Sequence, residues 1–185
     1  EAVATLVAAA QELSWADLAT VARAQCELGD VAAAHAAIEQ LDPGAQEAAE
    51  HRAVIGNVRS YLHGVAALAA GAAARAVGFF DHAYSTAPGE AACALALAVA
   101  LTASGDRTRL EEAADLFEQV AVADPSWIPA LAGLAWVLAA LGRHGEAAKV
   151  LTAVPATHPL RPEALTMACQ IMQSGRYDPE VAAAA

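Results

Sequence analysis

The chain has 185 residues, of which 57% are hydrophobic, so it is long enough to bury a core and too apolar for intrinsic disorder. Its 10 basic and 21 acidic residues give a net charge of −11 without any cluster of Lys or Arg. This balance excludes nucleic acid and anionic lipid as partners, because both need clustered cations. Abundant alanine, few aromatic residues and no strand-like alternation favour closely packed helices.

Apolar periodicity and turn residues predict helices along the whole chain. In chain order they cover 2–12, 15–28, 31–41, 46–70, 73–86, 90–104, 109–123, 127–141, 144–153 and 161–174. We group them into three parts. The parts are an N-terminal helix and linker at 1–13, a repeat domain of about four to five helix pairs at 14–176, and a C-terminal tail at 177–185.

Glycines recur in the predicted turns that follow successive first helices, at Gly29, Gly71, Gly105, Gly142 and Gly175. The spacings of 42, 34, 37 and 33 residues cluster around the period of about 34 that tetratricopeptide repeats show, with two helices per repeat. We interpret the spacing of 37 as about three extra residues in a longer turn at 107–109. The spacing of 42 indicates an extended helix or an added turn around 42–50.

The second helix of each repeat carries an Ala, a bulky apolar residue, a small or β-branched one and a Pro, with steps of 4, 3 and 5. The copies are Ala76, Phe80, Ala83 and Pro88; Ala113, Phe117, Val120 and Pro125; Ala147, Leu151, Val154 and Pro159. The Ala lets paired helices approach closely, the bulky residue fills the gap between them, and Pro follows the helix end. Gly64 takes the small-residue position of a first helix. The pattern predicts an all-α fold, a right-handed α-solenoid of antiparallel tetratricopeptide-type helix pairs.

Four stretches carry more than this general pattern: YLHGVAALAAG, AVGFFDHAYSTAPGEAACALALAVAL, VAVADPSWIPALAGLAWVLAALG and AAKVLTAVPATHP. Over about residues 14–172 the chain resembles the C-terminal tetratricopeptide repeat domain of protein kinase G, a soluble serine/threonine kinase of actinobacteria. The resemblance implies a regulatory and dimerising module that follows a rubredoxin-like segment and a kinase domain. The tryptophan-rich start of the family's second repeat is replaced here by 57–61.

The resemblance implies protein partners: the kinase domain of the same protein, a second protomer in a homodimer, or other signalling proteins. The chain itself lacks a Gly-rich loop and the VAIK, His-Arg-Asp and Asp-Phe-Gly motifs, so we expect no catalysis from it. Because it begins with Glu1, we expect it to be a segment of a longer protein. Two alternatives remain open: a free-standing adaptor or scaffold unrelated to a kinase, and an enzyme with an unrecognised site in its groove.

Cysteine and histidine usage indicates neither metal nor cofactor binding. Cys26, Cys93 and Cys169 are odd in number and widely separated, which favours a reducing cytoplasm over disulfides, and we interpret them as small residues at helix interfaces. His51, His63 and His82 share neither an HExxH motif nor the i,i+4 spacing of metal ligands. The uncharged stretch 125–142 approaches the length of a membrane span, but its prolines and its repeat register indicate a buried helix.

Two further surfaces are predicted from the sequence, an acidic face and an apolar groove. The acidic residues Glu111, Glu112 and Asp115 are interpreted as a helix start and solvated face. When each turn glycine is counted as position fifteen, positions two, five, nine and twelve of the first helices line the inner groove, and here they are apolar. The predicted protein-binding groove consists of Val58, Tyr61, Val65, Leu95, Val99 and Trp136. Such a groove suits a helix or peptide with hydrophobic anchors rather than a carboxylate tail, although Trp136 has the alternative of packing on a neighbouring helix.

Overall fold

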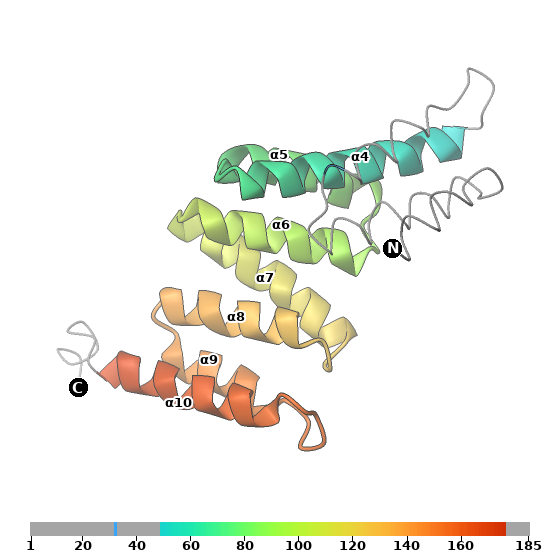
Figure 1. The fold of residues 1–185 in the computed structure, drawn as a ribbon. Coiled ribbons are helices and arrows are strands. Elements are labelled where there is room, and N and C mark those ends of the chain that lie inside the picture. Colours follow the sequence, from blue (N-terminus) through green and yellow to red (C-terminus); the bar gives the residue numbers. More distant parts are fainter. Residues whose placement is uncertain (1–31, 33–48, 177–185) are drawn as a thin grey trace. The chain divides into compact units, whose positions relative to one another are not determined.

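The computed structural model describes residue 32 and residues 49–176, and every element within those residues is a helix (Figure 1). The helices are α4 (Ala49–Ala69), α5 (Ala73–Thr86), α6 (Ala91–Ser104), α7 (Arg107–Ala123), α8 (Ile128–Ala140), α9 (His144–Thr152) and α10 (Arg161–Arg176). The all-α prediction is confirmed, and each helix predicted between 46 and 174 is present with ends within a few residues. The predicted helices before residue 42, the turn at Gly29 and the tail lie outside the described residues.

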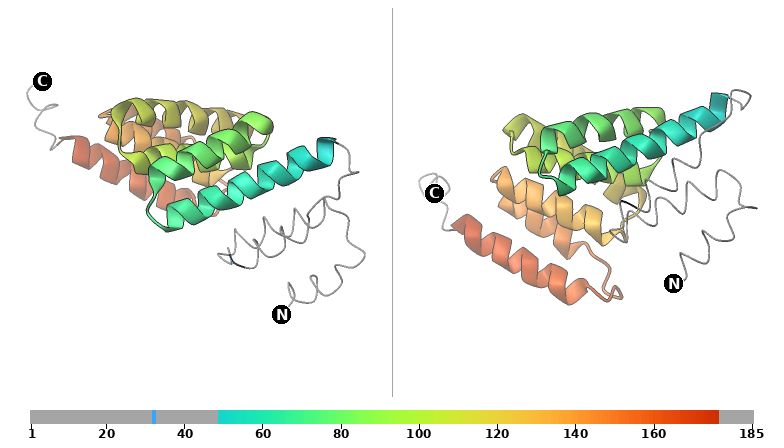
Figure 2. Two further views of the ribbon diagram at one scale, coloured as in Figure 1. Left: turned by 90° about the horizontal axis from the view of Figure 1, so that it is seen from above. Right: turned by 45° about the horizontal axis from the view of Figure 1, so that its top comes forward.

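The chain divides into two compact units, Glu1–Cys93 and Ala94–Ala185, with the boundary inside α6. In the first unit α4 packs on α5. In the second unit α7 packs on α8, α8 on α9, and α9 on α10, so these four helices pack in the order of the sequence. Within this second unit α8 and α10 form one layer and α7 and α9 the other (Figure 2). Helices that pack in chain order are the arrangement expected of a tetratricopeptide-type solenoid.

The predicted turn glycines Gly71, Gly105 and Gly142 all have positive φ, at 73°, 73° and 82°. Only glycine adopts this conformation without a steric penalty from Cβ. After α8 the N–H of Arg143 donates to the Leu138 carbonyl at 2.8 Å, and the N–H of Gly142 donates to the Ala139 carbonyl at 3.0 Å. This pair of bonds satisfies carbonyls at the end of α8 and reverses the chain into α9.

The α4–α5 pair crosses where Gly64 faces Phe80. A Cβ at Gly64 would lie 2.6 Å from Cε1 of Phe80, closer than real side chains approach. Ala76 and Ala83 on α5 are fully buried beside this ring. The predicted contact through small residues is confirmed, because any larger residue at position 64 would displace the phenylalanine.

A second crossing of this kind joins α7 to α8, and the sequence pattern did not reveal it. Here a Cβ at Gly133 would collide with the ring of Phe117. Phe117 is buried, and Ala113 on α7 and Ala130 on α8 are fully buried as well. Gly133 therefore lets the two helices of the second unit approach as closely as Gly64 does in the first.

The predicted longer turn at 107–109 is wrong, because these residues form the first turn of α7. Asp106 is the N-cap, and its side chain accepts a hydrogen bond from the N–H of Thr108 at 3.0 Å. This bond satisfies an N–H that has no partner inside the helix. Glu111 and Glu112 consequently lie beyond the first turn, so the interpretation as an acidic helix start is wrong as well, and both side chains are exposed.

A buried polar contact holds the first unit together at Asn57. Its side-chain amide donates to the Ala83 carbonyl at 2.5 Å and to Oγ1 of Thr86 at 3.0 Å. The Cys93 thiol donates to Oδ1 of Asn57 at 4.0 Å. Cys93 is thus a buried interface residue as predicted, whereas Cys169 is exposed and the same interpretation is wrong for it. Cys26 lies outside the described residues.

Candidate functional site

Three predicted groove residues belong to α4 in the first unit. Val58 is only 4% exposed and packs in the core, so it offers no surface to a partner. Tyr61 is half-buried and meets Phe80 edge-on, with ring centroids 5.5 Å apart and planes at 68°. Val65 is half-buried one turn further along α4. Much of the α4 side of the predicted groove is therefore occupied by packing within the unit.

The other three predicted residues lie in the second unit. Val99 on α6 is 44% exposed and Trp136 on α8 is 56% exposed, while Leu95 is half-buried. The neighbours of Trp136 on its own helix face are Ala132 and Ala139, which are half-buried. Methyl side chains cannot cover an indole, which is consistent with the exposure of Trp136.

The same register continues along α10, which the sequence analysis did not use. Counting back from Gly175 places Leu165, Cys169 and Met172 at positions five, nine and twelve, and all three are exposed. The predicted turn at Gly175 is wrong, because this glycine lies in the last turn of α10. Its place in the repeat spacing was nevertheless the sequence signal for these three positions. We define the apolar face of the second unit as Val99, Trp136, Leu165, Cys169 and Met172.

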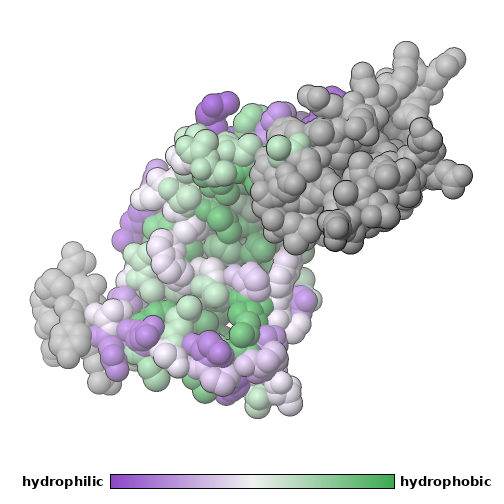
Figure 3. Space-filling model, viewed as in Figure 1, coloured by the Kyte–Doolittle hydropathy of each residue, from purple (hydrophilic) through white to green (hydrophobic). Residues whose placement is uncertain are grey.

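The chemistry of this face is hydrophobic. Neither α6 nor α8 contains an acidic or basic residue. In Figure 3 hydrophobic residues dominate the surface over these helices, and hydrophilic residues are more frequent over α10. Such a surface can bury an apolar side chain of a partner, and it supplies neither a general acid nor a charged group for binding a carboxylate.

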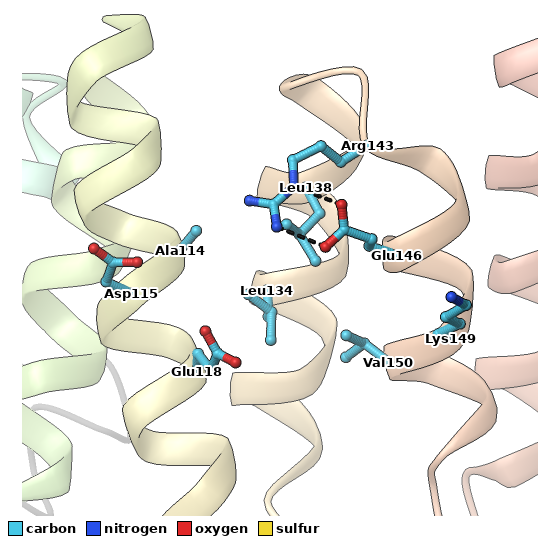
Figure 4. A pocket seen from close by; sticks show the side chains of 9 residues that line it. All are labelled: Ala114, Asp115, Glu118, Leu134, Leu138, Arg143, Glu146, Lys149 and Val150. Atoms are coloured by element: carbon cyan, nitrogen blue, oxygen red, sulfur yellow. Dashed lines mark hydrogen bonds and ion pairs between the residues drawn. The ribbon is translucent and has the colours of Figure 1, made fainter.

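A cleft of about 340 Å³ forms where α7, α8 and α9 meet in the second unit (Figure 4). It is lined from α7 by Ala114, Asp115 and Glu118, from α8 by Leu134 and Leu138, and from the start and body of α9 by Arg143, Glu146, Lys149 and Val150. Arg143 and Glu146 form a two-point ion pair, with Nε to Oε1 at 2.8 Å and Nη2 to Oε2 at 2.6 Å. The cleft therefore combines an apolar floor with charged walls.

The ion pair changes the pKa of both partners. The hydrogen bonds from Arg143 lower the pKa of the Glu146 carboxyl below its ordinary value. Glu146 in turn raises the pKa of the Arg143 guanidinium, and the negative charges of Glu118 and Glu111 add to that effect. Both groups are exposed, so the pair fixes the charge state and geometry of the α9 wall more than it stabilises the fold.

Within residues 49–176 the side chains form no cluster of three or more His, Cys, Asp and Glu suited to a metal ion. None of the described helices is both long and apolar enough to cross a membrane, and α8, the centre of the uncharged stretch 125–142, has 13 residues. The surfaces that remain are the apolar face and the mixed-charge cleft. Both are suited to contact with another macromolecule.

Comparison with known proteins agrees with the repeat pattern. The family model described as "Protein kinase G tetratricopeptide repeat" matches residues 2–185. No curated protein matches the chain. The family match covers both compact units and includes the turn glycines, the two helix crossings and the residues of the apolar face.

Proposed function

Because the chain belongs to the protein kinase G tetratricopeptide repeat family, we propose that it is the non-catalytic interaction and dimerisation module of a protein kinase G-like serine/threonine kinase. The exposed indole of Trp136 on the uncharged helix α8 carries this proposal. A large aromatic side chain that its own fold leaves in water is a usual anchor at protein interfaces. The parent kinase acts in the cytoplasm.

The apolar face determines what kind of partner binds. Val99 and Trp136 supply hydrophobic contact area, and the two helices that carry them supply no charge. A partner therefore gains affinity by burying apolar side chains in an amphipathic helix or an extended segment. The kinase domain of the same protein, a second protomer and a separate signalling protein are the proposed partners.

The test removes the anchor. Trp136→Ala should weaken self-association, or capture of the parent kinase domain, by about 2 kcal/mol or more. Sedimentation velocity over a range of concentrations measures self-association, and a pull-down with the purified kinase domain measures capture. The thermal unfolding temperature should stay close to that of the unchanged chain, because the ring is mostly in solvent.

Val122→Ala is the matched control. Val122 is also a large exposed apolar residue of the second unit, but it lies on α7 and outside the apolar face. Its truncation should leave association unchanged. If Trp136→Ala instead lowered stability by about 3–5 kcal/mol, the ring would be a core residue, and the proposal would lose its support.

A further inference from the structure

One wall of the mixed-charge cleft is acidic. Glu111, Asp115 and Glu118 are exposed on α7 with spacings of four and three residues, so they lie along one side of the helix. Asp115 and Glu118 line the cleft itself (Figure 4). Carboxylates placed one helical turn apart repel one another unless a cation lies between them.

The opposite wall neutralises these carboxylates only in part. The guanidinium of Arg143 is already engaged at two points by Glu146, which lies on the same wall. Lys149 is the remaining cation among the lining residues, so the lining carries three carboxylates, Asp115, Glu118 and Glu146, against two cations. The negative charges of Glu118 and Glu111 contribute to the raised pKa of Arg143, so this guanidinium and the acidic wall of α7 attract each other across the cleft.

The floor of the cleft is apolar. Leu134 and Leu138 of α8 form it, with Ala114 and Val150 at its edges. Its volume of about 340 Å³ is at the lower end of the range of ligand pockets, enough for a few side chains rather than a cofactor. A ligand that matches this cleft therefore combines a cation with a neighbouring apolar group.

We propose that the cleft between α7 and α9 docks a short basic segment of a partner protein. A Lys or Arg side chain of that segment reaches Asp115 and Glu118, and an adjacent apolar side chain lies on Leu134 and Leu138. The net charge of −11 favours approach of a basic segment over the whole chain. This site is separate from the apolar face and goes beyond the proposed function.

The charges of the cleft disfavour other ligands. An acidic segment would meet two carboxylates of α7, and the one guanidinium able to bind it at two points is held by Glu146. A bare divalent cation needs a compact group of oxygen ligands, and the part of the chain that the structure describes contains no such group. A peptide supplies the cation and the apolar contact together.

The test uses a fluorescently labelled short peptide of alternating lysine and leucine, and fluorescence polarisation measures its binding to the full chain. Glu118→Gln combined with Asp115→Asn should weaken binding about tenfold. Lys149→Gln should strengthen binding several-fold, because it removes the cation that repels the peptide. Trp136→Ala should leave binding unchanged, which separates this site from the apolar face.

Glu112→Asn and Glu112→Gln are matched controls, because Glu112 is exposed on the same helix but does not line the cleft. Circular dichroism checks that every variant remains folded. If Glu112→Gln weakened peptide binding as much as the single variant Glu118→Gln, the effect would reflect net charge alone, and the proposal would be overturned. Equal binding of a peptide of alternating lysine and serine would overturn it too, because the apolar floor would then contribute nothing.

Discussion

Helices α7 and α8 of the second unit pack on each other yet expose opposite chemistry. α7 presents the acidic side chains Asp115 and Glu118 to a cleft, whereas α8 has no charged residue and presents Trp136 to solvent. Their shared interior is the contact of Phe117 with Gly133. One helix pair thus combines a buried packing contact with two chemically different surfaces, the two that we propose bind partners.

The largest effect on stability is expected at the glycine crossings between paired helices. Gly133→Leu should force α7 and α8 apart and cost about 1–3 kcal/mol or more of unfolding free energy. Gly64→Leu should have a similar cost in the first unit, because a Cβ there also meets a phenylalanine ring. Thermal or urea unfolding measures both changes.

Gly78→Ala is the control for these substitutions. Gly78 lies within α5, is exposed, and has no atom within 4 Å of an added Cβ. Alanine is the better helix former, so this variant should gain about 0.4–1 kcal/mol. If Gly64→Leu and Gly133→Leu unfolded like the unchanged chain, the assigned helix register would be wrong.

The exposed ion pair between Arg143 and Glu146 should contribute less to stability than the glycine crossings. The folded-state pKa of Glu146 lies below its ordinary value of 4.5, so the ion pair with Arg143 stabilises the fold at neutral pH. This contribution is lost as pH falls through the lowered pKa. Glu146→Gln should therefore unfold at a slightly lower temperature than the unchanged chain at pH 7, and the difference should vanish in acid and in high salt. A large difference that persisted in acid would contradict the role given to this pair.

Local sequence patterns predicted the helices and most of their turns, but they did not predict every helix start or every contact between helices. Gly71 and Gly142 mark turns through a requirement of their own backbone, so they are readable from the sequence. The start of α7 at Arg107 was missed because Asp106 was assigned to a turn although it caps the helix. Gly133 was missed because its role depends on Phe117, a residue of the preceding helix.

The candidate sites show the same limit. Trp136 was predicted by its repeat position, and positions on α10 follow from the same rule once Gly175 is used. The cleft could not be predicted, because it forms only where side chains of α7, α8 and α9 meet. The burial of Val58 likewise depends on tertiary packing, which repeat position alone does not determine.

Solvent access to the Trp136 indole tests the central claim most directly. Replacing Trp15 and Trp127 with phenylalanine leaves Trp136 as the chain's one tryptophan, and acrylamide quenching then reports on that ring alone. The account predicts strong quenching in dilute protein and protection when the chain self-associates or binds the proposed kinase domain. Protection already present in the dilute monomer, or quenching that association leaves unchanged, would contradict the assignment of the apolar face as the protein-binding surface.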